Sequence, residues 1–325
     1  MKEARELSYE GLLEVLNAHD CKDSFDKSGR IPDCTELRDA LATAFGLEPV
    51  GSQGELGFES VANQAVLGID VYRYSQFEAL PQSLVPFVVR VLYSEACRQL
   101  QSVEPYLFQN ADEKEFRRHF IDAGDGGYQL LDTPIHAVVF ALHFETNLRA
   151  FNSFRFYPRL RALFERDLSA RYAITYDNVF TFQHNYYGAG IIKNARIIGR
   201  DRLNRCLMDQ GTFDWFTRNT RGVENLGSIG IQDLQEMSDF IEYDASSANQ
   251  EGQIFSPRGG FALESPWKDV DVLKIDDICV KSKSLAVYSL HVHSLCTMLD
   301  ENDSTKSATY TVTLGNLNTA GINDS

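Results

Sequence analysis

Asp125 is the first residue of this chain whose setting suits chemistry, because it lies in a Gly-Asp-Gly-Gly sequence at residues 124–127. The segment 120–132 alternates around this tip, a pattern that predicts two short strands joined by a tight turn. A carboxylate at the tip of a hairpin is well placed to hold a metal ion over a phosphate. An ordinary Asp-Gly turn explains the same four residues, so both interpretations stand at this point.

A second carboxylate, Asp70, ends an apolar run that begins at Ala65. The run predicts a buried central strand that delivers Asp70 at its C-terminal end, where a carboxylate can face a cation in a cleft. Asp122 lies close to the hairpin tip and is a further candidate helper.

A third candidate is Arg196, in a segment that predicts a turn and then a helix over 186–202. Gly188 and Gly190 allow close backbone approach, and the apolar residues that follow keep a helical period. A guanidinium suits the negative charge that builds on phosphate oxygens in a transition state. A charge pair on the helix surface is the alternative interpretation of Arg196.

Other elements must position these residues. Apolar residues with a period of 3.6 predict a helix over 84–100 that covers one face of the sheet. Thr133 as N-cap and Pro134 in the first turn predict the start of another helix after the hairpin. The segment 171–182 predicts a second β-hairpin.

Taken in order, three segments resemble the catalytic domain of class III nucleotidyl cyclases over residues 60–215. They are AVLGIDVYRYSQF, the Gly-Asp hairpin and YYGAGIIKNARI. The resemblance implies an α/β palm-type domain with a central, mostly antiparallel sheet and flanking helices. It also implies two Mg²⁺ or Mn²⁺ ions, held by Asp70, Asp125 and the backbone carbonyl of Val71. Two ions suit phosphoryl chemistry, because one activates the 3′-hydroxyl and the other neutralises the leaving pyrophosphate. Arg196 matches the family arginine that stabilises the transferring phosphate.

The chain departs from the family in its expected nucleotide-binding residues. Tyr74 and Ser75 match the family's phosphate loop, but Arg73 replaces its glycine. The loop therefore takes a different path or lets Arg73 contact phosphate directly. The family asparagine that orients the ribose aligns with Ile192, and Asn194 lies two residues further on, so ribose handling differs or the alignment slips.

Two positions that choose the base in this family hold Ile121 and Asn185. Isoleucine cannot hydrogen-bond a purine edge, whereas Asn185 has a donor and an acceptor and could bind a pyrimidine. The resemblance is therefore to the bacterial Pycsar pyrimidine cyclases of anti-phage defence, which convert UTP or CTP to cyclic UMP or cyclic CMP for a partner effector. A purine cyclase and a catalytically inactive nucleotide sensor remain alternatives.

The expected domains are a helical N-terminal segment at 1–58, a cyclase domain at 59–222 and a β-rich C-terminal subdomain at 223–325. The resemblance implies a homodimer with composite active sites, in which one copy supplies Asp70 and Asp125.

Composition narrows the class of protein. The net charge of −15 argues against general nucleic-acid binding. No apolar run approaches the ~20 residues that cross a bilayer, and the charged N-terminus differs from a signal peptide. Six scattered cysteines without a Cys-x-x-Cys pair favour free thiols in the cytoplasm.

Overall fold

The structure, a computed structural model, describes residues 5–19, 35–45, 47–50, 55–58, 63–109, 113–223, 229, 231–241, 243–244, 261–262, 269–280, 283–300, 303–316 and 318. These residues belong to two compact units. The larger unit contains residues 65–176 and 193–325, and the smaller unit contains residues 2–64 and 177–192.

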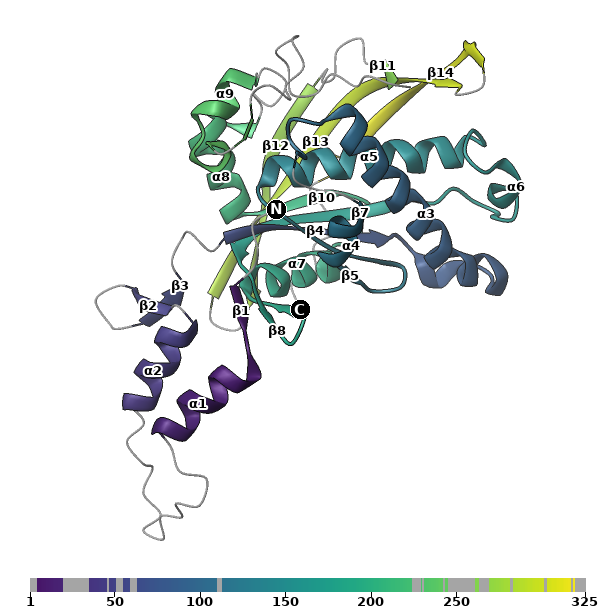
Figure 1. Ribbon diagram of the computed structural model, residues 1–325. Helices are drawn as coiled ribbons and strands as arrows, with labels where there is room; N and C mark the ends of the chain where they lie inside the picture. The colour runs from purple at the N-terminus through teal and green to yellow at the C-terminus, as the bar shows by residue number, and fades with distance from the viewer. Residues whose placement is uncertain are drawn as a thin grey trace. The chain divides into compact units, whose positions relative to one another are not determined.

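The larger unit is built on one sheet, which has nine strands within the described residues (Figure 1). Neighbouring strands follow the order β11-β13-β10-β7-β4-β6-β5, and β12 and β14 also pair with β13. The strands are β4 (Asn63–Val71), β5 (Phe120–Asp122), β6 (Gly126–Leu131), β7 (Ala170–Asn178), β10 (Cys206–Asp209), β11 (Phe261–Ala262), β12 (Asp269–Val280), β13 (Lys283–Asp300) and β14 (Asp303–Leu314). The helices are α3 (Ala79–Val103), α4 (Glu113–Arg118), α5 (Pro134–Asn152), α6 (Pro158–Arg161), α7 (Ala189–Arg200), α8 (Gln210–Thr220) and α9 (Ile231–Glu236), with 3₁₀ turns η2 (Tyr74–Gln76) and η4 (Ser238–Phe240).

This architecture confirms the predicted α/β class with a central, mostly antiparallel sheet and flanking helices. In this sheet β10 pairs with β7 in parallel, whereas β13 pairs in antiparallel register with β10, β11, β12 and β14, as does β6 with β4 and β5.

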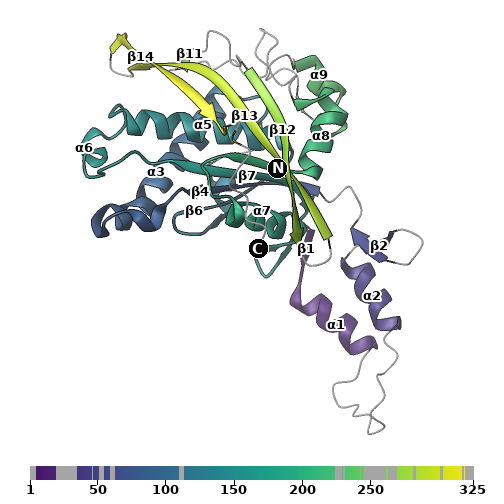
Figure 2. The same ribbon diagram turned by 180° about the vertical axis from the view of Figure 1, so that it is seen from behind.

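Strand β4 shows how the sheet separates its two faces. Ala65, Leu67, Ile69 and Val71 belong to the large core cluster that also contains the buried residues of α3 and α5. Because side chains alternate along a strand, Gly68 and Asp70 face the opposite side. A Cβ atom added to Gly68 would lie 2.1 Å from the side chain of Asn194 in α7. The two views place α5 and α7 on opposite sides of the strands (Figure 2).

The hairpin and the helix after it form as the sequence predicts. β5 pairs with β6, and β6 pairs with β4, both antiparallel. Helix α5 begins at Pro134 with Thr133 as its N-cap residue, but the Thr133 side chain makes no capping bond. Its hydroxyl instead lies 2.8 Å from Nδ1 of His136, one turn into the same helix.

The C-terminal strands extend the central sheet. Residues 287–290 of β13 pair with residues 206–209 of β10 in antiparallel register. The larger unit therefore contains residues 65–176 and 193–222 of the expected cyclase domain as well as the expected C-terminal subdomain, and one sheet runs across the expected boundary at residue 223. β13 then pairs with β14 through residues 292–300.

The smaller unit is a set of short elements. They are β1 (Arg5–Leu7), α1 (Tyr9–His19), α2 (Thr35–Phe45), β2 (Leu47–Val50), β3 (Glu55–Phe58), β8 (Phe180–Phe182) and β9 (Asn185–Tyr187). β8 pairs with β1 and with β9, so residues far apart in the sequence share one small sheet. The predicted hairpin over 171–182 is thus divided, because β8 pairs within this unit.

Two further expectations concern composition. In the described part of the chain, no helix has the length and apolar character that spanning a bilayer requires. Cys97 and Cys206 are buried and carry free thiols.

Candidate metal and nucleotide site

Asp70 and Asp125 lie at the same end of two adjacent strands. Asp70 pairs with Gly126 in the β4–β6 register, and Asp125 immediately precedes Gly126. The backbone nitrogen of Val71 donates a hydrogen bond to the carbonyl oxygen of Asp125, at 3.0 Å. A Cβ atom at Gly126 would lie 2.0 Å from the carbonyl oxygen of Ile69, so glycine permits this close approach. The hairpin therefore brings its acidic tip to the end of β4.

The ionisation of Asp125 depends on the neighbouring carboxylate of Asp70. Partial burial and the negative charge of Asp70 both raise the pKa of Asp125. Burial, followed by the charge of Asp70, also raises the pKa of Tyr128. Tyr128 is opposite Gly68 in the register, so it projects from the same face as Asp70. A cation at this point would relieve the repulsion between the two carboxylates.

Arg171 in β7 is a residue of this site that sequence reasoning missed. Its Nε lies 2.5 Å from Oδ2 of Asp70, and the two side chains are 21% and 24% exposed. The sequence places Arg171 at the start of a predicted strand, where the resembling family has an Arg-x-Gly-Ile-His-x-Gly motif, but neither signal names its partner. The contact joins residues 101 positions apart, and local patterns contain no information about such a pairing.

Asp122, the candidate helper, has a different role. Its Oδ1 accepts a hydrogen bond of 2.7 Å from the backbone nitrogen of Gly124. This bond closes the turn in which Gly124 has a positive φ of 89°. Asp122 therefore shapes the tip that presents Asp125.

The expected phosphate loop follows β4 directly. Arg73 has φ 59° and ψ 35°, the left-handed conformation that glycine favours, so the backbone keeps a glycine-like turn without the glycine. The Arg73 guanidinium is exposed and lies 4.9 Å from the ring centroid of Tyr72. Tyr74 packs partly against the core, while Ser75 is exposed.

Helix α7 turns its predicted residues in different directions. Ile192 is 50% exposed, whereas Asn194 is fully buried. The Asn194 amide nitrogen donates to the carbonyl oxygens of Val66 and Ala173, at 2.7 and 2.9 Å. Asn194 thus ties α7 to β4 and β7, and this burial is unlike that of a ribose-binding side chain.

Arg196 is half-buried on the same helix. Within the described residues, no hydrogen bond or ion pair engages its guanidinium, so the surface charge pair suggested by the sequence is not formed there.

The two expected base-reading residues belong to different units. Ile121 lies in β5 of the larger unit and is half-buried. Asn185 begins β9 of the smaller unit, where its side chain is exposed and its Nδ2 lies 3.3 Å from the Gln183 carbonyl oxygen.

The donor set fits a divalent ion that also binds a substrate. No group of three or more His, Cys, Asp or Glu side chains suited to a metal occurs in the described part of the chain. Two carboxylates with adjacent charges are nevertheless what Mg²⁺ uses when substrate phosphates complete its coordination. Asp70, Asp125 and the Val71 carbonyl are the groups that would hold such ions.

No protein-family model matches the chain, and no curated protein matches it. Solved structures do show similarity. An adenylate cyclase from Trypanosoma brucei is 13% identical, covers 71% of this chain and 89% of its own, and has a TM-score of 0.37. The adenylyl cyclase CyaB from P. aeruginosa is 10% identical, with 70% and 93% covered and a TM-score of 0.40. The guanylate cyclase domain of RhGC from Catenaria anguillulae, in complex with GTP, is 9% identical, with 71% and 97% covered and a TM-score of 0.38. At these identities and scores, the similarity assigns no activity or substrate to this chain.

Proposed function

We propose that the chain is a nucleotidyl cyclase that converts a nucleoside triphosphate to its 3′,5′-cyclic monophosphate and pyrophosphate. The observation that carries the proposal is the convergence of Asp70 and Asp125 at the end of β4, where the negative charge of Asp70 raises the pKa of Asp125. The positions of these two residues follow from the pairing of β4 with β6 in this structure and do not depend on the comparison with other proteins.

The reaction joins the ribose 3′-oxygen to the α-phosphorus and breaks the bond from that phosphorus to the bridging oxygen of the β-phosphate. The 3′-hydroxyl loses its proton, and pyrophosphate leaves with the electron pair. When bound, Mg²⁺ or Mn²⁺ would neutralise negative charge on the attacking 3′-oxygen and on the oxygen that leaves with pyrophosphate. Asp70 and Asp125 would hold the ions, together with the Val71 carbonyl.

Other residues have supporting roles in this proposal. Arg73, Tyr74 and Ser75 contact the triphosphate from the loop after β4. The guanidinium of Arg196 stabilises the charge that develops on the transferring phosphate. In a homodimer with composite sites, Arg196 comes from the copy that does not supply Asp70 and Asp125.

The substrate we propose is UTP or CTP. Ile121 offers no hydrogen bond to a purine edge, and the exposed amide of Asn185 can both donate and accept. Within this proposal the cyclic pyrimidine nucleotide serves as a second messenger in bacterial anti-phage defence and acts through a separate effector.

A catalytically inactive nucleotide sensor is a second candidate. It is favoured by one observation, the ion pair that already occupies Oδ2 of Asp70.

The test is to incubate the purified protein separately with ATP, GTP, CTP and UTP plus Mn²⁺, and to identify cyclic monophosphates by mass spectrometry. We expect a cyclic pyrimidine product whose rate falls at least about a hundredfold in Asp70→Ala and in Asp125→Ala, because each removes a metal ligand. Asp122→Ala on the same hairpin removes the bond that closes the turn but no metal ligand, so its rate should fall less than that of either variant.

The alternatives give different results. A cyclic purine product would keep the cyclase and reject the pyrimidine assignment. Binding of a nucleotide without any cyclic product, in the presence of Mn²⁺, would favour the sensor.

A further inference from the structure

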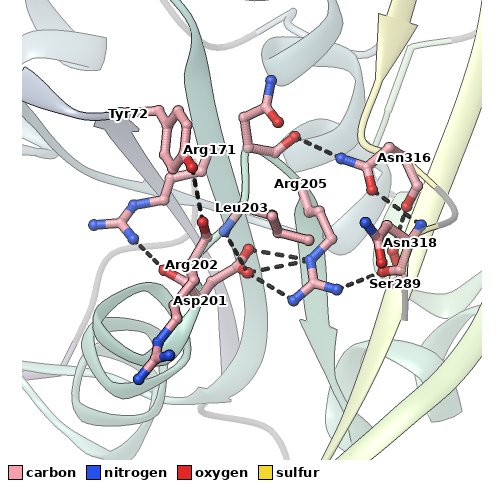
Figure 3. A network of polar contacts seen from close by, with 10 residues as sticks. Tyr72, Arg171, Asp201, Arg202, Leu203, Arg205, Ser289, Asn316 and Asn318 are labelled. Carbon is pink, nitrogen blue, oxygen red and sulfur yellow. Dashed lines mark hydrogen bonds and ion pairs between the residues drawn. The ribbon is translucent and has the colours of Figure 1, made fainter. Parts of the chain in front are cut away.

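The guanidinium of Arg171 has two hydrogen-bond partners, Asp70 and Asp201, and Figure 3 shows the contact with Asp201. Its Nε donates to Oδ2 of Asp70 at 2.5 Å, and its Nη1 donates to the backbone carbonyl oxygen of Asp201. The first partner is a proposed metal ligand, and the second belongs to the turn that follows α7. Arg171 therefore lies between the candidate site and a separate part of the larger unit.

This turn is itself fixed by a buried ion pair. Arg205 and Asp201 have side-chain exposures of 0% and 2%, and Nη2 of Arg205 lies 2.6 Å from Oδ1 of Asp201. The same oxygen accepts a hydrogen bond of 3.1 Å from the backbone nitrogen of Leu203. The Tyr72 hydroxyl donates to the carbonyl oxygen of Arg202 at 2.8 Å, which links the turn back to the residues after β4.

The anchorage continues to the C-terminal strands. Nη1 of Arg205 donates to the carbonyl oxygen of Asn318, whose backbone nitrogen bonds the Asn316 side chain at 3.0 Å. The Ser289 hydroxyl of β13 donates to the Asn316 carbonyl oxygen at 2.9 Å. Because Arg171 is bonded both to Asp70 at the end of β4 and to this anchored turn, the guanidinium is held in place.

The position of this charge matters for the two carboxylates. Nε of Arg171 lies 2.5 Å from Oδ2 of Asp70, and Asp125 immediately precedes Gly126, the register partner of Asp70. Arg171 thus cancels about one of the two negative charges that a divalent ion would otherwise meet. A nucleoside triphosphate would bring the missing negative charge together with the ion.

We propose that Arg171 is a positioning residue that acts as the fixed counter-charge of Asp70 and sets the affinity of the Asp70–Asp125 site for a divalent cation. The inference rests on the proposed function, because it takes these carboxylates as metal ligands. It predicts that the free metal ion binds weakly because of one cation on β7, and that the site favours a metal ion that arrives bound to a triphosphate.

The experiment measures Mn²⁺ binding to the full chain without nucleotide, by electron paramagnetic resonance of the free ion. Arg171→Gln removes the charge and should tighten Mn²⁺ binding by about tenfold, since one charge at contact distance alters an ion's energy on this scale in a partly exposed site. Arg171→Lys keeps the charge and should stay within about threefold of the wild type. Arg202→Gln, an exposed arginine of the same turn, is the matched control and should leave Mn²⁺ binding unchanged.

Unchanged or weaker binding in Arg171→Gln would overturn the proposal, and weaker binding in both Arg171 variants would mean that the guanidinium only orients Asp70. Arg171→Met is a second charge-free variant if Arg171→Gln does not fold, as checked by thermal unfolding. The titration contains no nucleotide, so its result is distinct from that of the turnover assay. Tighter binding in Arg171→Gln without any cyclic product would keep this inference and remove the proposed function.

Discussion

The amide nitrogen of Asn194 lies 2.7 Å from the carbonyl oxygen of Val66, and this contact joins helix α7 to the central strand β4. The same nitrogen also reaches the Ala173 carbonyl of β7 at 2.9 Å. One buried side chain therefore bridges three elements that carry the candidate site.

The first prediction tests this bridge. Asn194→Ala should lower the free energy of unfolding by about 1–3 kcal/mol, because two backbone carbonyls lose their buried donor. Asn194→Asp should lower the free energy of unfolding by at least as much, since a carboxylate oxygen would then face those two carbonyl oxygens. Urea unfolding checks both variants. An alanine variant with normal stability but altered turnover would instead restore the ribose role.

The second prediction concerns the space between β4 and α7. Gly68→Ala would place a Cβ atom 2.1 Å from Oδ1 of Asn194 and 2.4 Å from Cδ1 of Ile198. We expect a loss of about 1–3 kcal/mol in the free energy of unfolding, because the interior cannot accept the added volume.

Gly199→Ala is the matched control in the same region, because nothing lies within 4 Å of its added Cβ atom. It should be neutral or stabilise α7 by up to about 1 kcal/mol, as alanine is the better helix former. Equal effects of the two substitutions in urea unfolding would contradict the packing described here.

The third prediction separates strain from binding at Arg73. Arg73→Gly should raise the free energy of unfolding by up to about 1 kcal/mol, because glycine adopts the left-handed conformation without a Cβ penalty. The KM for the nucleoside triphosphate should rise in the same variant, since a cation beside the phosphates is lost.

Arg221→Gly is the control, because Arg221 also has a positive φ, 57°, at the end of α8. It should change stability in the same direction and leave KM unaltered. A KM unchanged by Arg73→Gly would show that Arg73 serves the turn alone.

The fourth prediction concerns pH. Burial lowers the pKa of His143 in α5 to about 4 from its usual value of 6.5. Below pH 6.5 the unfolded chain takes up a proton that the folded chain does not, so stability should fall progressively between pH 6.5 and 4. Above pH 6.5 His143 should make no pH-dependent contribution.

His143→Gln should flatten this fall relative to the wild type, as measured by urea unfolding at pH 7.5, 6 and 5. Burial also lowers the pKa of His136, so part of the slope should persist in the variant. Identical slopes for the two proteins would show that folding does not lower the pKa of His143.

Sequence patterns predicted the local elements well. The apolar run before Asp70, the Gly-Asp tip and Pro134 each depend on a few consecutive residues, and the structure has β4, the β5–β6 hairpin and α5 at those places. The closeness of Asp70 and Asp125 could be expected only through resemblance to a family, because it depends on the pairing of β4 with β6.

Features that depend on strand order were missed. The contact of Arg171 with Asp70 requires β7 to lie beside β4, and no periodicity specifies which strands are neighbours. The same reason explains the C-terminal strands, which were expected as a separate subdomain and instead continue the sheet through β10. The motif position of Asn194 predicts a contact with the nucleotide, whereas its burial depends on contacts with β4 and β7 that the motif does not specify.

The pairing of β10 with β13 has a consequence for synthesis of the chain. β10 ends at Asp209, and its partner residues 287–290 follow almost eighty residues later. Until they emerge from the ribosome, β10 has an open edge beside buried residues such as Leu207, and such edges pair readily with other chains. Folding of this sheet therefore has a late step of high contact order, and a chain interrupted before Lys283 should aggregate rather than persist as a smaller domain.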